Sequence, residues 1–434
     1  MIRVGNIMTG MALSLILCGA TSGLERFPPP DFTETDHVIP SPTVPGPRQD
    51  IYEYIDAGVL LAALGLASYL VLKKRSRRAI FALMVFSLLY FGFWRKGCVC
   101  PIGAIQNITL SIFDADYVVP IVVAAFFLLP LVFTLFFGRT FCAAVCPLGA
   151  VQDVVLSHPV SVPSWAESGL RLFAYVYLGA AVLFAATGSA FVICRYDPFV
   201  SIFRLSGDLN ILILGGSLLL VSVFIGRPYC RFICPYGVIL RQLSRLSKWR
   251  VTITPDECIR CRLCEDSCPF GAIRRPTTDW PAHDYNRSKK RLGLLLVLMP
   301  VLIFLGGWAA SSLKTVTSRA HETVRLAERI YLEETGEVEQ TTEASAAFRA
   351  TGKEIQALYE EASDLRAKFG WGGWIVGGFV GLVIGLKLIR LSVWRRRTDY
   401  EADRAGCLAC GRCFEYCPRE QVRLDKAKEA IDKC

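Results

Sequence analysis

The chain has 434 residues, of which 53% are hydrophobic and 20% charged, and its formal net charge is +10. A water-soluble globular domain of this length carries more charge, and long apolar segments separated by basic clusters are typical of a polytopic membrane protein. The basic residues lie beside the apolar segments. The positive charge is therefore interpreted as a signal for membrane orientation, and nucleic-acid binding is not expected.

The first twenty residues resemble a signal peptide. Arg3 supplies the positive start, residues 7–17 form an apolar core, and Cys18 begins a Cys-Gly-Ala cleavage site of small residues. An uncleaved membrane anchor is the alternative. Residues 21–53 are rich in proline and predict an extended periplasmic linker.

Seven later segments are long and apolar enough to cross a hydrocarbon core about 30 Å thick, which needs roughly 20 residues. They are 54–72, 79–94, 117–137, 169–193, 209–225, 292–312 and 371–393. Basic clusters follow or precede four of them, at 73–78, 241–250, 289–291 and 395–397. A single threading places all four clusters in the cytoplasm. We therefore expect an all-α polytopic protein of the bacterial inner membrane with about seven transmembrane helices, five of them within residues 54–250.

This threading places residues 313–370 in the periplasm. Apolar side chains repeat there at helical spacing, at Ile355, Leu358, Tyr359, Ala362 and Leu365. The pattern predicts surface helices that pack on the membrane domain. A docking surface for a periplasmic partner is the alternative interpretation.

The chain holds seventeen cysteines. A disulfide framework would be the ordinary explanation, but eight of them form two copies of C-x2-C-x2-C-x3-C-P, at 258–269 and 407–418. This is the spacing of bacterial ferredoxins, in which the fourth cysteine binds the other cluster. The pattern assigns one 4Fe–4S cluster to Cys258, Cys261, Cys264 and Cys417, and a second to Cys407, Cys410, Cys413 and Cys268. Zinc sites of four cysteines are the alternative.

The two ferredoxin halves, 251–280 and 400–425, are separated by two predicted spans. The threading places both halves in the cytoplasm, where they could form one small two-cluster ferredoxin module. If the halves did not meet, each motif would hold a cluster with its own four cysteines.

A second cysteine pattern, G-R-x-F/Y-C-x3-C-P-x-G, occurs at 138–149 and 226–237. Its two sulfurs lie one helical turn apart, and sulfur ligands select iron–sulfur clusters, copper or zinc. The candidate ligands are Cys142, Cys146, Cys230 and Cys234. The structural alternative is that proline ends a helix, glycine reverses the chain and cysteine packs as a small apolar residue.

Three further cysteines, Cys98, Cys100 and Cys194, fall on the outer side of the threading and form another candidate metal site, which lacks an obvious fourth ligand. The segment C-P-I-G-A-I-Q-N at 100–107 returns as C-P-L-G-A-V-Q-D at 146–153. We interpret this repeat as a shared helix-reversing elbow, used on opposite membrane faces.

Other redox cofactors are not indicated. None of the four histidines lies inside a predicted span, so a membrane haem is not expected. The spans hold almost no carboxylates for a proton relay. Neither a P-loop nor a strand-borne G-x-G-x-x-G is present, so no bound nucleotide is predicted.

The multispan helices, the paired C-x3-C-P motifs and the double ferredoxin motif resemble the polyferredoxin membrane proteins of the NosR/NapH group. The resemblance covers roughly residues 54–418 and is specific in 142–147, 230–235 and the two ferredoxin motifs. It implies an electron-transfer component, rather than a stand-alone enzyme, that passes electrons between cytoplasmic donors or the quinone pool and a periplasmic flavoprotein or reductase.

The chain departs from the NosR branch, in which a periplasmic domain carries flavin linked through a threonine. Neither residues 21–53 nor 314–370 would accommodate such a domain, so a separate flavoprotein would supply the flavin, or the chain is NapH-like. The related CcoG-type proteins share these motifs. They suggest the alternative function of a copper-handling assembly factor, in which the elbow cysteines bind copper and the clusters reduce it.

Overall fold

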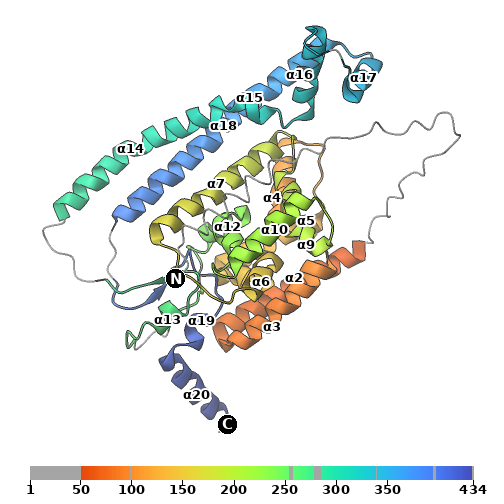
Figure 1. The fold of residues 1–434 in the computed structure, drawn as a ribbon. Helices are drawn as coiled ribbons and strands as arrows, with labels where there is room; N and C mark the ends of the chain where they lie inside the picture. Colours follow the sequence, from red (N-terminus) through yellow and green to blue (C-terminus); the bar gives the residue numbers. More distant parts are fainter. Residues whose placement is uncertain are drawn as a thin grey trace.

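A computed structural model describes residues 50–97, 100–253, 258–277, 285–338, 340–393 and 397–432. The predicted signal peptide, nearly all of the proline-rich linker and Cys98 lie outside the described residues. The described chain is mostly helical, and its two strands form one small sheet (Figure 1).

The first half of the described chain forms a helical bundle in which several short helices lie between longer ones. In chain order its elements are α2 (Asp50–Tyr69) with its π-helical continuation η1 (Leu70–Lys74), α3 (Arg77–Ser87) with η2 (Leu88–Trp94), α4 (Pro101–Phe113), α5 (Ile121–Phe137), η3 (Phe141–Val145), α6 (Pro147–Val154), α7 (Ser164–Ala186), α8 (Val192–Arg195), α9 (Val200–Arg204), α10 (Leu209–Ser222), α11 (Pro228–Phe232) and α12 (Pro235–Leu243).

The second half contains a long helical hairpin and the ferredoxin segments. Its elements are α13 (Leu263–Asp266), β1 (Ile273–Arg274), α14 (Tyr285–Ser312), α15 (Lys314–Ser318), α16 (Glu322–Glu334), α17 (Glu343–Ala350), α18 (Ile355–Ser392), β2 (Glu401–Ala402), α19 (Arg412–Glu415) and α20 (Pro418–Asp432).

Five helical segments of the described chain are long and apolar enough to cross a membrane. They are Ile51–Lys74, Arg77–Trp94, Ser164–Ala186, Asn286–Ser312 and Ile355–Ser392. They coincide with five of the seven predicted spans. The other two predicted spans form shorter helices: α5 has 17 residues and α10 has 14, or about 26 and 21 Å at 1.5 Å per residue. Pro120 and Gly138 bound α5, which explains its length.

The helices α14 and α18 form the long hairpin and pack along each other through glycines (Figure 1). A Cβ atom on Gly373 would lie 2.9 Å from the carbonyl oxygen of Ala310, and one on Gly377 would overlap the backbone of Gly306. The glycines of α18 therefore allow close contact between the two backbones. On its other side α18 packs against α7, where the rings of Phe184 and Phe369 are 5.7 Å apart.

The predicted surface helices between spans six and seven form a small core of their own. Leu358, Ala362 and Leu365 of α18 are buried against residues of α16 that include Val324 and Ile330. This cluster lies at the end of the hairpin opposite α13 and α19 (Figure 1). The apolar face predicted at 355–365 is therefore correct. Its partner, however, is α16, and the face belongs to the same continuous helix as the last span.

The two ferredoxin halves meet where α14 begins and α18 ends (Figure 1). Strand β1 pairs antiparallel with β2, with Ile273 opposite Ala402 and Arg274 opposite Glu401. Contacts between α13 and α19 bring the two cysteine motifs together. The halves, which are remote in sequence, therefore form one module.

The Cys-Pro elbows lie between two helices. The predicted helix end is present, because η3 ends at Val145 before Cys146 and α11 ends at Phe232 before Cys234, and a new helix begins at each proline. Cys100, Cys146 and Cys234 are the N-cap residues of α4, α6 and α12, and each is followed by proline at the first helical position. Proline suits this position because its missing N–H would have no partner in the first turn. The elbow glycines lie within these helices and do not reverse the chain.

Candidate iron–sulfur sites

The first candidate site is a small cavity between the two ferredoxin halves. Its cysteine lining consists of Cys258, Cys261, Cys264 and Cys417. Three of these come from the loop around α13 and one precedes α20. Ile253 and Tyr400 close the cavity with apolar surface. This is the set of four that the bacterial ferredoxin pattern assigns to one cluster.

The second candidate site is another small cavity in the same module. Its cysteine lining consists of Cys268, Cys407, Cys410 and Cys413. Burial raises the pKa of the Cys407 thiol to about 12, and burial also raises the pKa of Cys413. Without a cation these thiols would be neutral at pH 7. Iron bound in the cavity would compensate the charge of their thiolates.

The four cysteines that line each cavity fit the ligand set of a four-iron cluster. A tetrahedral zinc site needs four sulfurs about 2.3 Å from one centre. A four-iron cluster instead takes one thiolate at each iron, so its ligands surround a cavity. The chemistry such clusters supply is one-electron transfer.

A buried ionic network joins the second cavity to the elbows. Asp153 of α6 is 3% exposed, and its carboxylate lies 3.0 Å from Arg77, 3.4 Å from Arg227 and 3.5 Å from Arg412. Arg77 also donates a 3.0 Å hydrogen bond to the carbonyl of Cys410. One carboxylate thus holds three arginines that come from the membrane bundle and from the ferredoxin module.

The elbow cysteines lie together behind this network. The Cys146 thiol donates a hydrogen bond to the sulfur of Cys230, which raises the pKa of Cys146 and lowers that of Cys230. Arg139 approaches the sulfur of Cys142 at 3.7 Å, and Gln152 approaches the sulfur of Cys230 at 3.4 Å. Donors aimed at sulfur stabilise thiolate ligands of iron–sulfur clusters.

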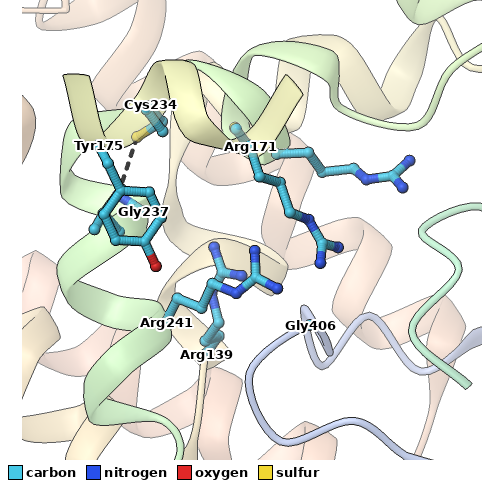
Figure 2. A pocket seen from close by; sticks show the side chains of 11 residues that line it. Arg139, Arg171, Tyr175, Cys234, Gly237, Arg241 and Gly406 are labelled. Carbon is cyan, nitrogen blue, oxygen red and sulfur yellow. Dashed lines mark hydrogen bonds between the residues drawn. The ribbon is translucent and has the colours of Figure 1, made fainter. Parts of the chain in front are cut away.

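Basic side chains surround a small cavity beside these cysteines (Figure 2). Cys230 and Cys234 line it together with Arg139, Arg171 and Arg241. Burial, followed by the charge of Arg139, lowers the pKa of Arg241 to about 10, so this guanidinium stays charged at neutral pH. The elbow region is therefore positively charged and suits an anionic group.

Cys100 packs against the large core that also contains Cys142, Cys146 and Cys234, and α4 contacts α12. That the two elbow copies lie on opposite membrane faces stays a prediction. Cys194 follows Ile193 in α8 and is exposed. Its sulfur lies beside Gly103, the third residue of α4.

Sequence reasoning did not assign roles to several side chains that connect these sites. Arg139 and Arg227 occupy the same position in the two G-R-x-F/Y-C motifs, and Asp153 and Gln152 end the repeated C-P-L-G-A-V-Q-D segment. The repeat could have predicted this role, because an arginine at the same position in two paired-cysteine motifs suggests hydrogen bonds to sulfur or to backbone groups. In the fold Arg227 donates to the carbonyls of Cys142 and Ala143.

Comparison with protein families finds iron–sulfur domains in the same segments. One family described as a 4Fe-4S binding domain matches residues 119–161 and 208–254, which contain the two elbows. A second family, also described as a 4Fe-4S binding domain, matches residues 251–274, the first ferredoxin half. No solved structure is detectably similar to the chain.

Individual relatives match over shorter stretches. The Escherichia coli (strain K12) protein YccM, described provisionally as an electron transport protein, is 30% identical over 118 residues, which is 25% of this chain and 33% of YccM. Protein NirI of Paracoccus denitrificans (strain Pd 1222) is 29% identical over 119 residues, which is 26% of this chain and 18% of NirI. The chain therefore matches only about a third of YccM and less of NirI. Segments of the chain therefore match 4Fe-4S binding domains, and the chain is similar over part of its length to a protein described provisionally as an electron transport protein.

Proposed function

We propose that the chain is an inner-membrane electron-transfer subunit, with two 4Fe–4S clusters in a cytoplasmic ferredoxin module, that exchanges electrons with a periplasmic flavoprotein or reductase. The observation that carries the proposal is the lining of the two ferredoxin cavities. Each contains three cysteines of one motif and the fourth cysteine of the other. This exchange of the fourth ligand characterises two-cluster bacterial ferredoxins, whose clusters transfer electrons.

A third centre at the elbows forms part of the proposal. Cys142, Cys146, Cys230 and Cys234 would supply its thiolates. The hydrogen-bond donors of Arg139 and Gln152 and the basic cavity favour an anionic iron–sulfur centre. Such a centre would lie next to the Asp153 network and hence next to the second ferredoxin cavity. It would extend the electron path from the module into the membrane bundle.

The proposed orientation is supported by the position of the loop between α2 and α3. Arg75 of this basic loop pairs with Glu420 at 3.0 Å, and Arg77 donates to Cys410. The loop and the ferredoxin module therefore share one end of the molecule. The positive-inside rule assigns that end to the cytoplasm. Labelling of cysteines introduced at Arg78 or Glu337 in spheroplasts would test this against the parent protein, in which native cysteines such as the exposed Cys194 set the background. Only Glu337→Cys should add label from an impermeant reagent.

Double substitutions test the exchanged fourth ligand. If Cys417 serves the cluster of Cys258, then Cys417→Ser with Cys258→Ser damages one cluster, and the protein keeps about four of its eight ferredoxin irons. In contrast, Cys417→Ser with Cys407→Ser damages both clusters and removes about eight irons. Iron and sulfide analysis with electron paramagnetic resonance measures the loss, and Cys434→Ser is the matched control. The opposite ranking would show that each motif holds its own cluster.

Metal analysis also separates electron transfer from copper handling. The proposal expects wild type to contain iron, acid-labile sulfide and no stoichiometric copper. It also expects the double variant Cys142→Ser with Cys230→Ser to lose iron that wild type holds in addition to the eight irons of the two ferredoxin clusters. Copper bound by wild type and lost in that double variant, with iron unchanged, would instead support the copper-handling alternative.

A further inference from the structure

The repeated elbow builds a second thiol pair, at Cys100 and Cys194. In the elbow at α6, Gln152 lies six residues after Cys146, and its side-chain oxygen accepts a 3.0 Å hydrogen bond from the backbone N–H of Tyr229, directly before Cys230. This clamp positions Cys230 beside Cys146. Gln152 is fully buried, so its hydrogen bonds are not exchanged with water.

The elbow at α4 contains the same device. Gln106 lies six residues after Cys100 and is also fully buried. Its side-chain oxygen accepts a 2.9 Å hydrogen bond from the backbone N–H of Ile193, directly before Cys194, and its nitrogen donates to the carbonyl of Ala190 at 3.4 Å. The relation of Cys100, Gln106 and Cys194 therefore repeats that of Cys146, Gln152 and Cys230.

Gly103 provides the space for the second pair. It lies one helical turn after the N-cap Cys100, so its side-chain position is on the same face of α4. A Cβ atom there would lie 3.1 Å from the sulfur of Cys194. The absent side chain allows this sulfur to reach the first turn of α4, where Cys100 is located.

The charges around the two pairs differ. Arginines surround the α6 pair, as described above. Beside the α4 pair lies Asp197, which is 3% exposed and accepts a 2.9 Å hydrogen bond from the backbone N–H of Phe199. The charge of Asp197 acts on Cys100, and a carboxylate beside the pair disfavours an anionic thiolate centre. These surroundings suit a pair that is neutral in both oxidation states.

We propose that Cys100 and Cys194 form a redox-active dithiol that closes reversibly to a disulfide by exchange with a disulfide-bearing protein or small molecule. The exposed Cys194 loses its proton and attacks one sulfur of the partner disulfide as a thiolate, and the first partner sulfur leaves as a thiolate that takes up a proton. The buried Cys100 then attacks the sulfur of Cys194, and the Cys100 proton passes to the second partner sulfur, which leaves as a thiol. Two electrons and two protons pass from the pair to the partner.

Equilibration of the purified full-length protein with glutathione redox buffers tests this proposal. Oxidised glutathione should remove two free thiols and produce a peptide linked between Cys100 and Cys194, with a mass about 2 Da lower. Dithiothreitol should restore both thiols. The link should persist in Cys98→Ser and disappear in Cys100→Ser and in Cys194→Ser. Gln106→Leu should slow its formation by releasing the segment that carries Cys194.

Two results would overturn the proposal. One is alkylation of both cysteines after oxidation without any linked peptide. The other is loss of iron or another metal in Cys194→Ser, which would make this cysteine a metal ligand. The test does not depend on the proposed clusters, because the disulfide is read by mass. If the purified protein holds no iron but still forms the Cys100–Cys194 link, the proposed electron-transfer function is rejected and the dithiol proposal stands.

Discussion

Replacement of Asp153 by asparagine would remove the one carboxylate that holds three arginines between the elbows and the ferredoxin module. Asparagine keeps the shape of the side chain and loses its charge. Arg227 is fully buried and has Asp153 as its ion-pair partner at 3.4 Å. Breaking a buried pair by removing one partner costs roughly 3–5 kcal/mol. We expect Asp153→Asn to lower the free energy of unfolding by about that amount at pH 7.

The stability difference between wild type and Asp153→Asn should depend on pH. Burial alone raises the pKa of Asp153, but the charges of Arg227, Arg77 and Arg412 outweigh burial and hold the pKa below its usual value. Because the pKa is lower in the folded protein than in the unfolded chain, the carboxylate stabilises the fold above about pH 4. This stabilisation is lost as the pH falls through the folded pKa. The difference between wild type and variant should therefore shrink in acid.

Thermal unfolding in detergent, followed by tryptophan fluorescence and iron release, measures both effects. Asp208→Asn is the matched control, because Asp208 is exposed and its change should stay within about 0.5 kcal/mol. An Asp153→Asn protein as stable as this control at pH 7 would refute the argument that the carboxylate neutralises buried arginine.

Two further substitutions test the hairpin and the elbow. Gly377→Val should force α14 and α18 apart, because the valine side chain would overlap the backbone of Gly306. We expect the free energy of unfolding to fall by about 1–3 kcal/mol or more. Limited proteolysis should cut the hairpin of this variant faster than the hairpin of the exposed control Gly293→Val. Gln152→Leu should lower the reduction potential of an elbow centre by removing the donor 3.4 Å from the Cys230 sulfur. A redox titration with unchanged midpoints would contradict this role.

Local features of the fold were predictable from the sequence. Hydrophobic length alone identified five helices that can cross a membrane, because a span must bury a continuous apolar segment. The same criterion overestimated α5 and α10. Residue counts do not reveal that helices flanked by proline, glycine and Cys-Pro elbows stop short.

The elbows show the limit of motif reading. The sequence identified the repeated Cys-Pro segment and predicted a helix end there, but it did not predict that each proline also begins a new helix. In the fold Cys100 packs against the large core that contains the other elbow cysteines. Those neighbours come from helices far apart in the sequence, so spacing could not reveal them.

The sequence by itself determined the eight ferredoxin cysteines, their division into two motifs and the membrane character of the chain. These depend on short-range spacing and on composition. Only the tertiary structure decided that the two halves meet, that Asp153 joins three arginines behind them, and that Gln106 and Gln152 position equivalent cysteines. The physical reason is that ligand spacing is a property of one loop. Charge pairing and helix contact depend on which distant segments pack together.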